Sequence, residues 1–262
     1  MKYKKRSFVN IVFLAITLLF NGLGAFGIIN GMSQQKVSAK YPTFITPAGF
    51  TFSIWSVIYI LLFASVLVLY WKRNEDYYKK FLDKGSLLFW ISCILNILWV
   101  IVFSFEMIGI SFILIFLFLI TLLFILRTLY KFRSDNSWLL PITFGIYGGW
   151  VFIATIVNGA AYLESIDFQR FGMSQEIFYS ILLIATIFLA ILVQGYHKNA
   201  IFLLPMVWAF YGIYKALGPI SSHKVIHMIL IGGMIIFLLF IGKVFHKNKY
   251  KIYPKVFKPI LK

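Results

Sequence analysis

Residues 147–158 read YGGWVFIATIVN and lie within an apolar run long enough to cross a bilayer. Tyr147, Trp150, Ala154 and Asn158 follow one another at steps of three and four residues, and this spacing places them on one face of a helix. Leu and Ile side chains can face lipid on every side of a helix, whereas an amide in hydrocarbon must find a hydrogen-bond partner. The stretch therefore predicts a membrane helix whose polar and aromatic face is turned toward protein, a ligand or a water-filled cavity.

Two further apolar runs carry similar faces at the same steps, each mixing aromatic rings with a hydrogen-bonding group. One interpretation is that all three faces are helix contacts, because amides and small residues commonly hold membrane helices together. The other is that they form the wall of a pocket for a flat aromatic ligand. Spacing alone leaves both open. The two faces consist of Phe52, Trp55 and Tyr59 in the first run and of Asn96, Trp99 and Phe103 in the second.

The composition places the chain in a membrane. It has 262 residues, of which 61% are hydrophobic and 19% aromatic, and a soluble domain of this size has too few interior positions to bury them. We therefore predict an all-α integral membrane protein. Runs of about 20 apolar residues give eight predicted transmembrane helices, at about 8–30, 50–71, 85–105, 108–130, 139–162, 177–196, 200–216 and 225–243.

The basic residues indicate how the chain is oriented. The formal net charge is +17, but no nucleic-acid motif accompanies it, so we expect no nucleic-acid partner. With the N-terminus inside, all but five of the 25 Lys and Arg residues fall on the cytoplasmic side, which predicts that both termini are cytoplasmic. No small-residue cleavage site follows the N-terminal run, so we interpret it as an uncleaved helix, which fits a bacterial plasma membrane. The five exceptions are Lys36, Lys40, Arg170, Lys215 and Lys224.

Three stretches resemble the signature stretches of the TspO/MBR family, the tryptophan-rich sensory and translocator proteins. They are TPAGFTFSIWSVIYIL (46–61), LNILWVIVFS (95–104) and YGGWVFIATIVN (147–158), and they occur in the family's order. The family has a Pro-rich segment followed by Trp and then Tyr, next Leu-Asn-x-x-Trp with a later Phe, and then Tyr-x-x-Trp with a later Asn. The matching residues here are Pro47, Trp55, Tyr59, Leu95, Asn96, Trp99, Phe103, Tyr147, Trp150 and Asn158.

The resemblance implies a fold and a ligand class. It covers about 1–163 and implies a TspO-like five-helix bundle whose pocket accepts porphyrins such as protoporphyrin IX or haem, and in some members sterols. It also implies a homodimer. We expect no required cofactor. The chain would then be a long variant, with three additional transmembrane helices in 164–243 and a basic cytoplasmic tail in 244–262. We expect this tail to lie against anionic headgroups.

The sequence departs from the family pattern at two places. The family has two prolines before Gly-Trp, where this chain has Pro47, Ala48, Gly49 and Phe50, and Phe50 lies one residue too close to Trp55. A further Trp of the family is replaced by a tyrosine at residue 162. Losing indoles weakens the case for Trp-dependent porphyrin chemistry more than the case for binding, because Tyr and Phe rings still stack.

We therefore expect a sensory or translocator-type membrane protein that binds a porphyrin or related tetrapyrrole, for sensing or transport. A permease or a membrane partner subunit of a transport system is the alternative, and a porphyrin-degrading enzyme is a third hypothesis. No Asp, Glu, Lys or Arg stands at the centre of a predicted span, which counts against ion-coupled transport, and no catalytic or metal-binding motif is visible. We expect the loop 31–49 to act as a lid and Pro47, Gly49 and Phe50 to lie at the pocket entry. The candidate ligand-binding residues are Phe52, Trp55, Tyr59, Asn96, Trp99, Phe103, Tyr147, Trp150, Ala154 and Asn158.

Overall fold

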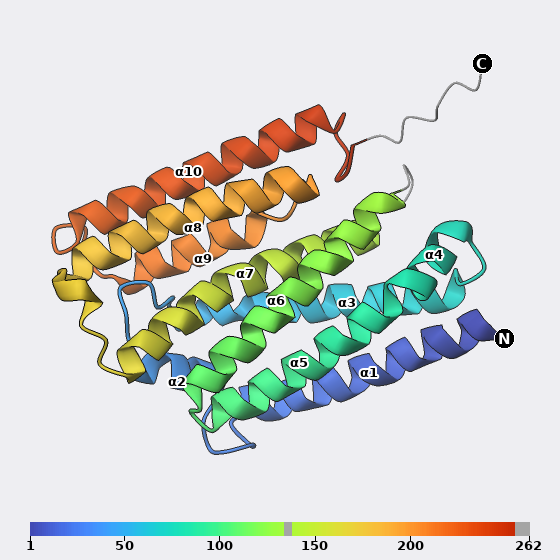
Figure 1. Ribbon diagram of the computed structural model, residues 1–262, viewed down its shortest axis with the longest axis horizontal. Coiled ribbons are helices and arrows are strands. Elements are labelled where there is room, and N and C mark those ends of the chain that lie inside the picture. The colour runs from blue at the N-terminus through green and yellow to red at the C-terminus, as the bar shows by residue number, and fades with distance from the viewer. Residues whose placement is uncertain (134–137, 255–262) are drawn as a thin grey trace.

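A computed structural model describes residues 1–133 and 138–254, and in these two ranges the regular structure is entirely helical (Figure 1). The elements are α1 (Lys2–Ala25), α2 (Gln34–Lys40), η1 (Gly49–Ser53), α3 (Ile54–Trp71), α4 (Asp76–Lys84), α5 (Ser86–Ser104), α6 (Ile108–Lys131), α7 (Leu139–Ser165), η2 (Arg170–Gly172), α8 (Gln175–His197), α9 (Leu204–Ala216) and α10 (Lys224–Lys247).

Seven of these helical segments are long and apolar enough to cross a membrane, namely α1, η1 with α3, α5, α6, α7, α8 and α10. This confirms the all-α membrane fold, but the seventh predicted span, 200–216, is longer than the helix found there. Its helix, α9, has 13 residues, or about 20 Å at 1.5 Å per residue, which is shorter than a hydrocarbon core of about 30 Å. Residues 200–203 form a turn instead.

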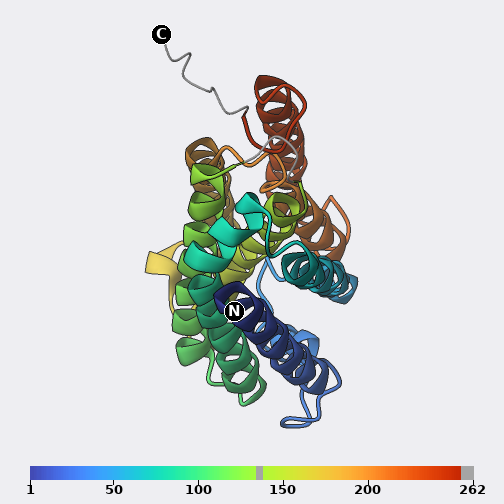
Figure 2. The ribbon, with the colours of Figure 1, turned by 90° about the vertical axis from the view of Figure 1, so that its right-hand side faces the viewer.

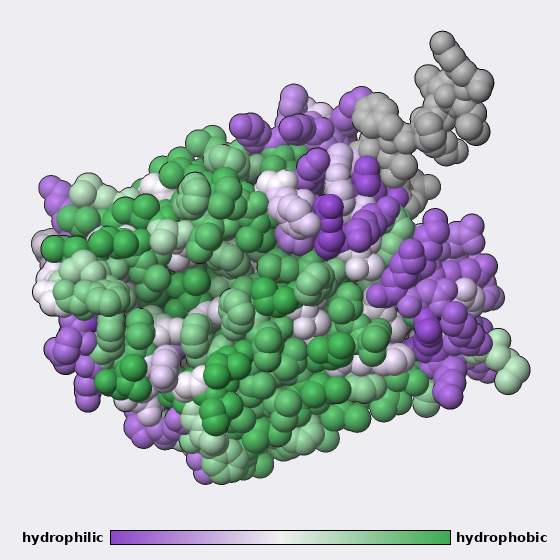
Figure 3. Space-filling model, viewed as in Figure 1, coloured by the Kyte–Doolittle hydropathy of each residue, from purple (hydrophilic) through white to green (hydrophobic). Residues whose placement is uncertain are grey.

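Although α9 is short, the chain still passes through the molecule an even number of times, as the prediction of eight spans requires. In Figure 1, α8 and α10 run toward the end that holds the N-terminus, and α9, which lies between them in the sequence, runs in the opposite direction. Purple, hydrophilic atoms gather at that end, beyond a broad apolar band (Figure 3). The placement of the N-terminus and of the last described residue, Pro254, at one end agrees with the predicted topology, while the cytoplasmic location of both termini stays a prediction.

Some boundaries and segments differ from the prediction. α1 ends at Ala25 and not near residue 30, because the chain turns at Gly27, whose φ of 72° suits glycine. Two short helices, α2 and α4, were not predicted. α4 packs against α1 through Asp83, which pairs with Lys2 and Arg6 at 2.7 Å each. An amphipathic helix of nine residues is hard to recognise within a loop as charged as 72–84.

The described part of the tail makes contacts with protein that were not predicted, while its contact with headgroups stays a prediction. Residues 248–254 pack against protein: the Tyr253 hydroxyl donates to the carbonyl of Leu126 at 3.2 Å, and the Ala200 amide donates to the carbonyl of Ile252 at 3.0 Å. Tyr253 is only 6% exposed, so its ring gains more from this packing than from the bilayer surface. Residues 255–262, the rest of the tail, lie outside the described residues, and the division of the chain into domains stays a prediction.

α7 is the most deeply buried span. Protein buries 72% of its apolar window, compared with 28–44% for the six other spans. Small residues permit this close packing, since a Cβ on Gly149 would lie 2.0 Å from the carbonyl oxygen of Phe202. α1 and α10 lie on opposite sides of the molecule (Figure 2). α7 contacts both α6 and α9, and therefore joins the first five spans to the three helices that follow, α8 to α10.

One ion pair joins α2 to the turn between α5 and α6. Lys40 and Tyr41 both donate hydrogen bonds to the Glu106 carboxylate, which sits in the tight turn between α5 and α6. The hydrogen bond from Lys40, more than that from Tyr41, lowers the pKa of Glu106 below its ordinary value. A carboxylate with a depressed pKa stabilises the folded state above its unfolded pKa, and that contribution is lost as the pH falls through the folded value.

We therefore expect α2 to loosen in acid. Below the ordinary glutamate pKa of about 4.3, amide hydrogens of residues 33–41 should exchange faster than at neutral pH, after correction for the intrinsic exchange rate. Hydrogen exchange followed by mass spectrometry measures this directly. Glu106→Gln is the control, because it should exchange fast at both pH values, and an equally steep pH response in that variant would contradict the assignment.

Candidate functional site

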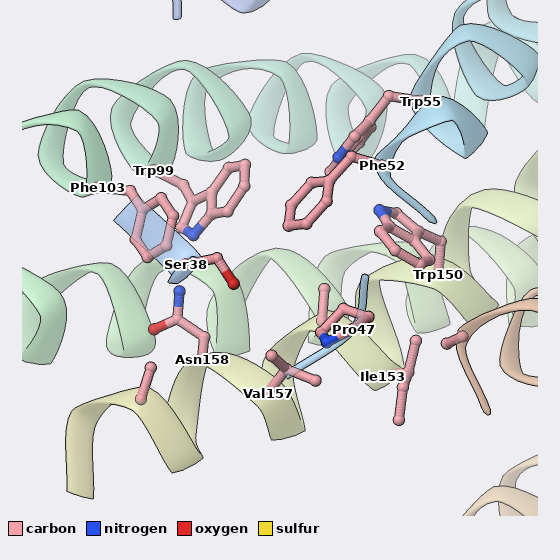
Figure 4. Close-up of a pocket in the computed structure, with 13 residues that line it drawn as sticks. Ser38, Pro47, Phe52, Trp55, Trp99, Phe103, Trp150, Ile153, Val157 and Asn158 are labelled. Atoms are coloured by element: carbon pink, nitrogen blue, oxygen red, sulfur yellow. The ribbon is translucent and has the colours of Figure 1, made fainter. Parts of the chain in front are cut away.

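Three indole rings from three helices meet around a cavity of about 40 Å³ (Figure 4). The ring centre of Trp55 lies 6.0 Å from that of Trp99 and 6.1 Å from that of Trp150, the latter edge to face. These rings come from the start of α3, the C-terminal half of α5 and the middle of α7. The full lining is Ser38, Pro47, Phe52, Trp55, Trp99, Phe103, Trp150, Ile153, Ala154, Val157, Asn158, Ala161 and Ala209.

Local structure explains why these side chains converge. The 3₁₀ turn η1 precedes α3 directly and turns Phe52 toward the edge of Trp150, with ring centres 6.4 Å apart. On α5, Trp99 stacks on Phe103 at 5.4 Å, as expected of side chains four residues apart on a helix. On α7, the lining residues follow the helical repeat from Trp150 to Ala161.

Three hydrogen-bond donors face this mostly apolar cavity. The indole Nε1 atoms of Trp99 and Trp150 are buried and have no hydrogen-bond partner among the described residues, and Figure 4 shows both turned into the pocket. Asn158 accepts a hydrogen bond from the Ser111 hydroxyl at 3.1 Å, while its amide nitrogen points toward Ser38 (Figure 4). The site thus offers donors to the acceptor atoms of a ligand.

A second cavity, of about 300 Å³, lies on the other side of the aromatic wall. Phe52, Trp55 and Trp99 line both cavities, so these rings form the partition between them. The second cavity is more polar, because amides and hydroxyls from α1, α2 and α3 line it. Its other residues are Leu18, Asn21, Gly22, Ala25, Ser33, Gln34, Gln35, Ser56 and Tyr59.

The structure places Asn96 in a hydrogen-bond network and not in the lining of either cavity. Asn21 on α1 donates to the Asn96 side-chain oxygen, and the Tyr59 hydroxyl donates to the Asn21 oxygen at 2.5 Å. This network joins α1, α3 and α5, so the helix-contact interpretation holds for Asn96. Tyr59, by contrast, both joins the network and lines the second cavity.

Three other candidates lie behind or beside the cavities. Tyr147 is 2% exposed and packs edge to face against Trp55 and Phe118, so it supports the aromatic wall from behind. Gly49 contacts Gln35, since a Cβ there would lie 2.0 Å from the amide nitrogen of that side chain. Phe50, which sequence reasoning placed at the pocket mouth, lines neither cavity.

The loop before α3 is held by α9, one of the helices beyond the first five spans. The Ala48 amide donates to the carbonyl of Gly212 at 3.1 Å, and the Trp208 indole donates to the carbonyl of Thr51 at 2.9 Å. Phe50 packs edge to face on Trp208, with ring centres 5.5 Å apart. α9 therefore positions the pocket loop and also lines the first cavity through one alanine, residue 209.

Sequence reasoning missed several lining residues. Ile153, Val157 and Ala161 share the α7 face of the predicted Trp150, Ala154 and Asn158, so extending the same helical spacing would have found them. Asn21 could have been found by the argument applied to the other span amides. Ser38 and Ala209 carried no local signal, because tertiary packing alone brings α2 and α9 to the cavity.

Comparison with known proteins gives one match. The family described as TSPO-like protein matches residues 7–242, which span the chain from α1 into α10. The match therefore runs through α8 and α9 and is not confined to the first five spans. No curated protein and no solved structure matched the chain. Because the match covers most of the sequence, the chain belongs to the family of TSPO-like proteins, which are TspO-type integral membrane proteins.

Proposed function

We propose that this protein binds a planar hydrophobic ligand of the porphyrin class, for sensing or transport, in the space now divided between the two cavities. The observation that carries the proposal is the wall of Phe52, Trp55 and Trp99, which has a cavity on each side. A flat π-system can stack against these rings in place of their mutual contacts. Among the described residues, the lining contains no charged side chain and several aromatic rings, which suits the hydrophobic body of such a ligand.

The sizes of the cavities define how binding would proceed. Pockets for ligands of drug size measure about 300–1,000 Å³, whereas the cavity at Trp150 has about 40 Å³. The neighbouring cavity has about 300 Å³, so a tetrapyrrole fits only if the partition opens. Phe52 is the side chain best placed to move, because it stands on the short turn η1 and not on a long helix. Binding thus requires displacement of the loop that α9 holds.

The polar groups match the periphery of a porphyrin. Protoporphyrin IX carries carboxylates, which accept hydrogen bonds from indole and amide N–H groups. The two unpaired indole nitrogens and the amide nitrogen of Asn158 offer such donors on one side. Gln34 and Gln35 line the polar cavity on the other side.

We expect saturable binding of protoporphyrin IX to the detergent-purified protein, followed by tryptophan quenching and by the Soret band. Trp150→Leu removes one stacking ring and one donor, and should weaken binding about tenfold or more. Asn158→Leu should weaken it in the same direction, because it removes the amide donor. Circular dichroism must show the same helical content in all variants.

Trp71→Leu is the matched control, because Trp71 is 69% exposed at the end of α3 and lines neither cavity. It should lower the total tryptophan signal without changing the affinity. Binding that is unsaturable, or indifferent to Trp150→Leu and Asn158→Leu, would contradict the proposal. The aromatic faces would then be helix contacts, and the permease or partner-subunit alternative would move to first place.

A further inference from the structure

We propose that the groove between α6 and α8 binds one anionic phospholipid, with an acyl chain in the groove and the phosphate at its basic end. This site is separate from the two cavities described above, since it shares no residue with them. The proposal does not depend on porphyrin binding. It rests on a cluster of cations, on the shape of the groove and on one buried histidine.

Three cations surround a single ring at the end of the molecule where the termini lie. The charged groups of Arg127, Arg133 and Lys198 stand 5.4, 4.5 and 5.8 Å from the ring centre of Tyr130. Arg127 also lies over Tyr196, at 4.5 Å. Like charges held this close repel one another, and a bound anion would relieve that repulsion.

No carboxylate within the two described ranges neutralises this cluster. The acids that the structure describes near the same end already have other partners: Asp83 pairs with Lys2 and Arg6, Glu75 with Lys72, and Asp76 with Lys79. Arg133 donates to the carbonyls of Tyr130 and Pro254, and these bonds position the guanidinium without cancelling its charge. As far as the described residues go, the positive charge of the three side chains is therefore available to an anion.

An apolar groove leads from this cluster toward the middle of the membrane. It measures about 390 Å³ and runs along α6 from Arg127 back to Ile120, a distance of about 10 Å at 1.5 Å per residue. Aliphatic and aromatic side chains from both helices line it, as suits an acyl chain. The lining comprises Ile120, Leu123, Phe124, Arg127, Leu192, Val193, Tyr196 and His197.

His197 supplies a hydrogen-bonding group at the basic end of the groove. It lines the groove, is 4% exposed, and its Nδ1 atom finds no partner in the described part of the chain. Tyr196 stands beside it and is 59% exposed, which places a phenol where the ester region of a lipid would lie. A basic mouth above an apolar groove matches a phospholipid with a net negative head group, whereas free phosphate would leave the groove unexplained.

Native mass spectrometry of the full chain tests this. Phosphatidylglycerol and phosphatidylcholine with identical acyl chains are titrated separately, and the first bound lipid is quantified for each. We expect phosphatidylglycerol to bind more tightly. Each basic residue near a membrane surface is worth about fivefold in affinity for an anionic lipid, so Arg127→Gln with Lys198→Gln should weaken the first binding step about 25-fold. Lys243→Gln, which removes a cation lying over Phe240 outside the groove, should leave it unchanged.

The acyl chain is tested by filling the groove. Val193→Phe narrows the groove without touching the charges and should weaken phosphatidylglycerol binding, whereas Ile184→Phe, on a lipid-facing position of α8 outside the groove, should not. Equal affinity for the two lipids in the unaltered chain would overturn the proposal. Full displacement of phosphatidylglycerol by inorganic phosphate, or a Val193→Phe variant that binds it normally, would show an anion site without a lipid chain and would also overturn it.

Discussion

Gly149→Ala is expected to unfold at a clearly lower temperature than the unaltered chain. A Cβ at this position would lie 2.0 Å from the carbonyl oxygen of Phe202 and 3.1 Å from its carbonyl carbon. Backbone atoms cannot rotate away as a side chain can, so α7 and the turn before α9 must separate. Overpacking of a buried site costs about 1–3 kcal/mol and occasionally more, and this one lies where α7 joins the first five spans to the helices α8 to α10.

The chain carries its own reporter for this measurement. Cys93 is the single cysteine, is 3% exposed and lies in α5. A thiol-reactive fluorogenic dye should therefore label the protein only as it unfolds, and the labelling midpoint on heating gives the stability of each variant. Because Cys93 lies on α5, and neither on α7 nor in the turn before α9, its labelling should report unfolding of the bundle and not the local change.

Two other helical glycines provide matched controls. A Cβ added to Gly195 in α8 or to Gly232 in α10 would meet no atom within 4 Å. Alanine there should be neutral or should stabilise the helix by about 0.5–1 kcal/mol, because glycine loses more conformational entropy on folding. If Gly149→Ala unfolded at the same temperature as these two controls, the close contact between α7 and Phe202 would not contribute to stability.

The long spans could be predicted from the sequence because their signal is local. Runs such as 108–130 and 139–162 follow from apolar length alone, and the structure places helices there at Ile108–Lys131 and Leu139–Ser165. The start of α9 could not be predicted in this way. An apolar turn precedes its 13 residues, and the two together have the hydropathy of one longer span. Hydropathy counts apolar residues and does not detect where the backbone stops being helical.

The sequence predicted which residues share a helix face, but not which of these faces meet around a cavity. Spacing placed Trp150, Ala154 and Asn158 together on α7, and all three line one cavity. It could not separate Asn96, which binds Asn21 across a helix contact, from Asn158, whose amide nitrogen points into the pocket. The two asparagines have the same chemistry and similar spacing, and only the neighbouring helix decides what each one meets. The contacts of α9 with the pocket loop could not be predicted for the same reason.

Gly212→Ala is expected to release the pocket loop from α9. A Cβ on Gly212 would lie 2.0 Å from the Thr51 hydroxyl oxygen and 2.9 Å from the methyl carbon of the same residue. Thr51 is fully buried, so its side chain has no space into which it can turn. The carbonyl of Gly212 accepts from Ala48, and the carbonyl of Thr51 accepts from Trp208, so forcing the two segments apart breaks both bonds. Amide hydrogens of residues 44–53 should then exchange faster, while those of α6 stay protected.

A second substitution separates release of the loop from general damage. Thr51→Ala removes both of the closest atoms and leaves only the Thr51 Cβ, at 3.0 Å from the new Cβ. It also keeps the backbone carbonyl that Trp208 binds, and it deletes a buried hydroxyl that has no partner among the described residues. The double variant should therefore recover most of the protection, with a coupling of about 0.5–3 kcal/mol between the two sites.

The same variants connect the loop to the pocket. If Phe52 must move for a porphyrin to enter, Gly212→Ala should raise the association rate of protoporphyrin IX, and the double variant should restore the slower rate. Fast exchange in 44–53 with an unchanged association rate would mean that α9 holds the loop but that the loop is not the route of access. Slow exchange in all variants would show that the contacts with α9 do not hold the loop, and the match of the family across α8 and α9 would then need a reason other than the pocket.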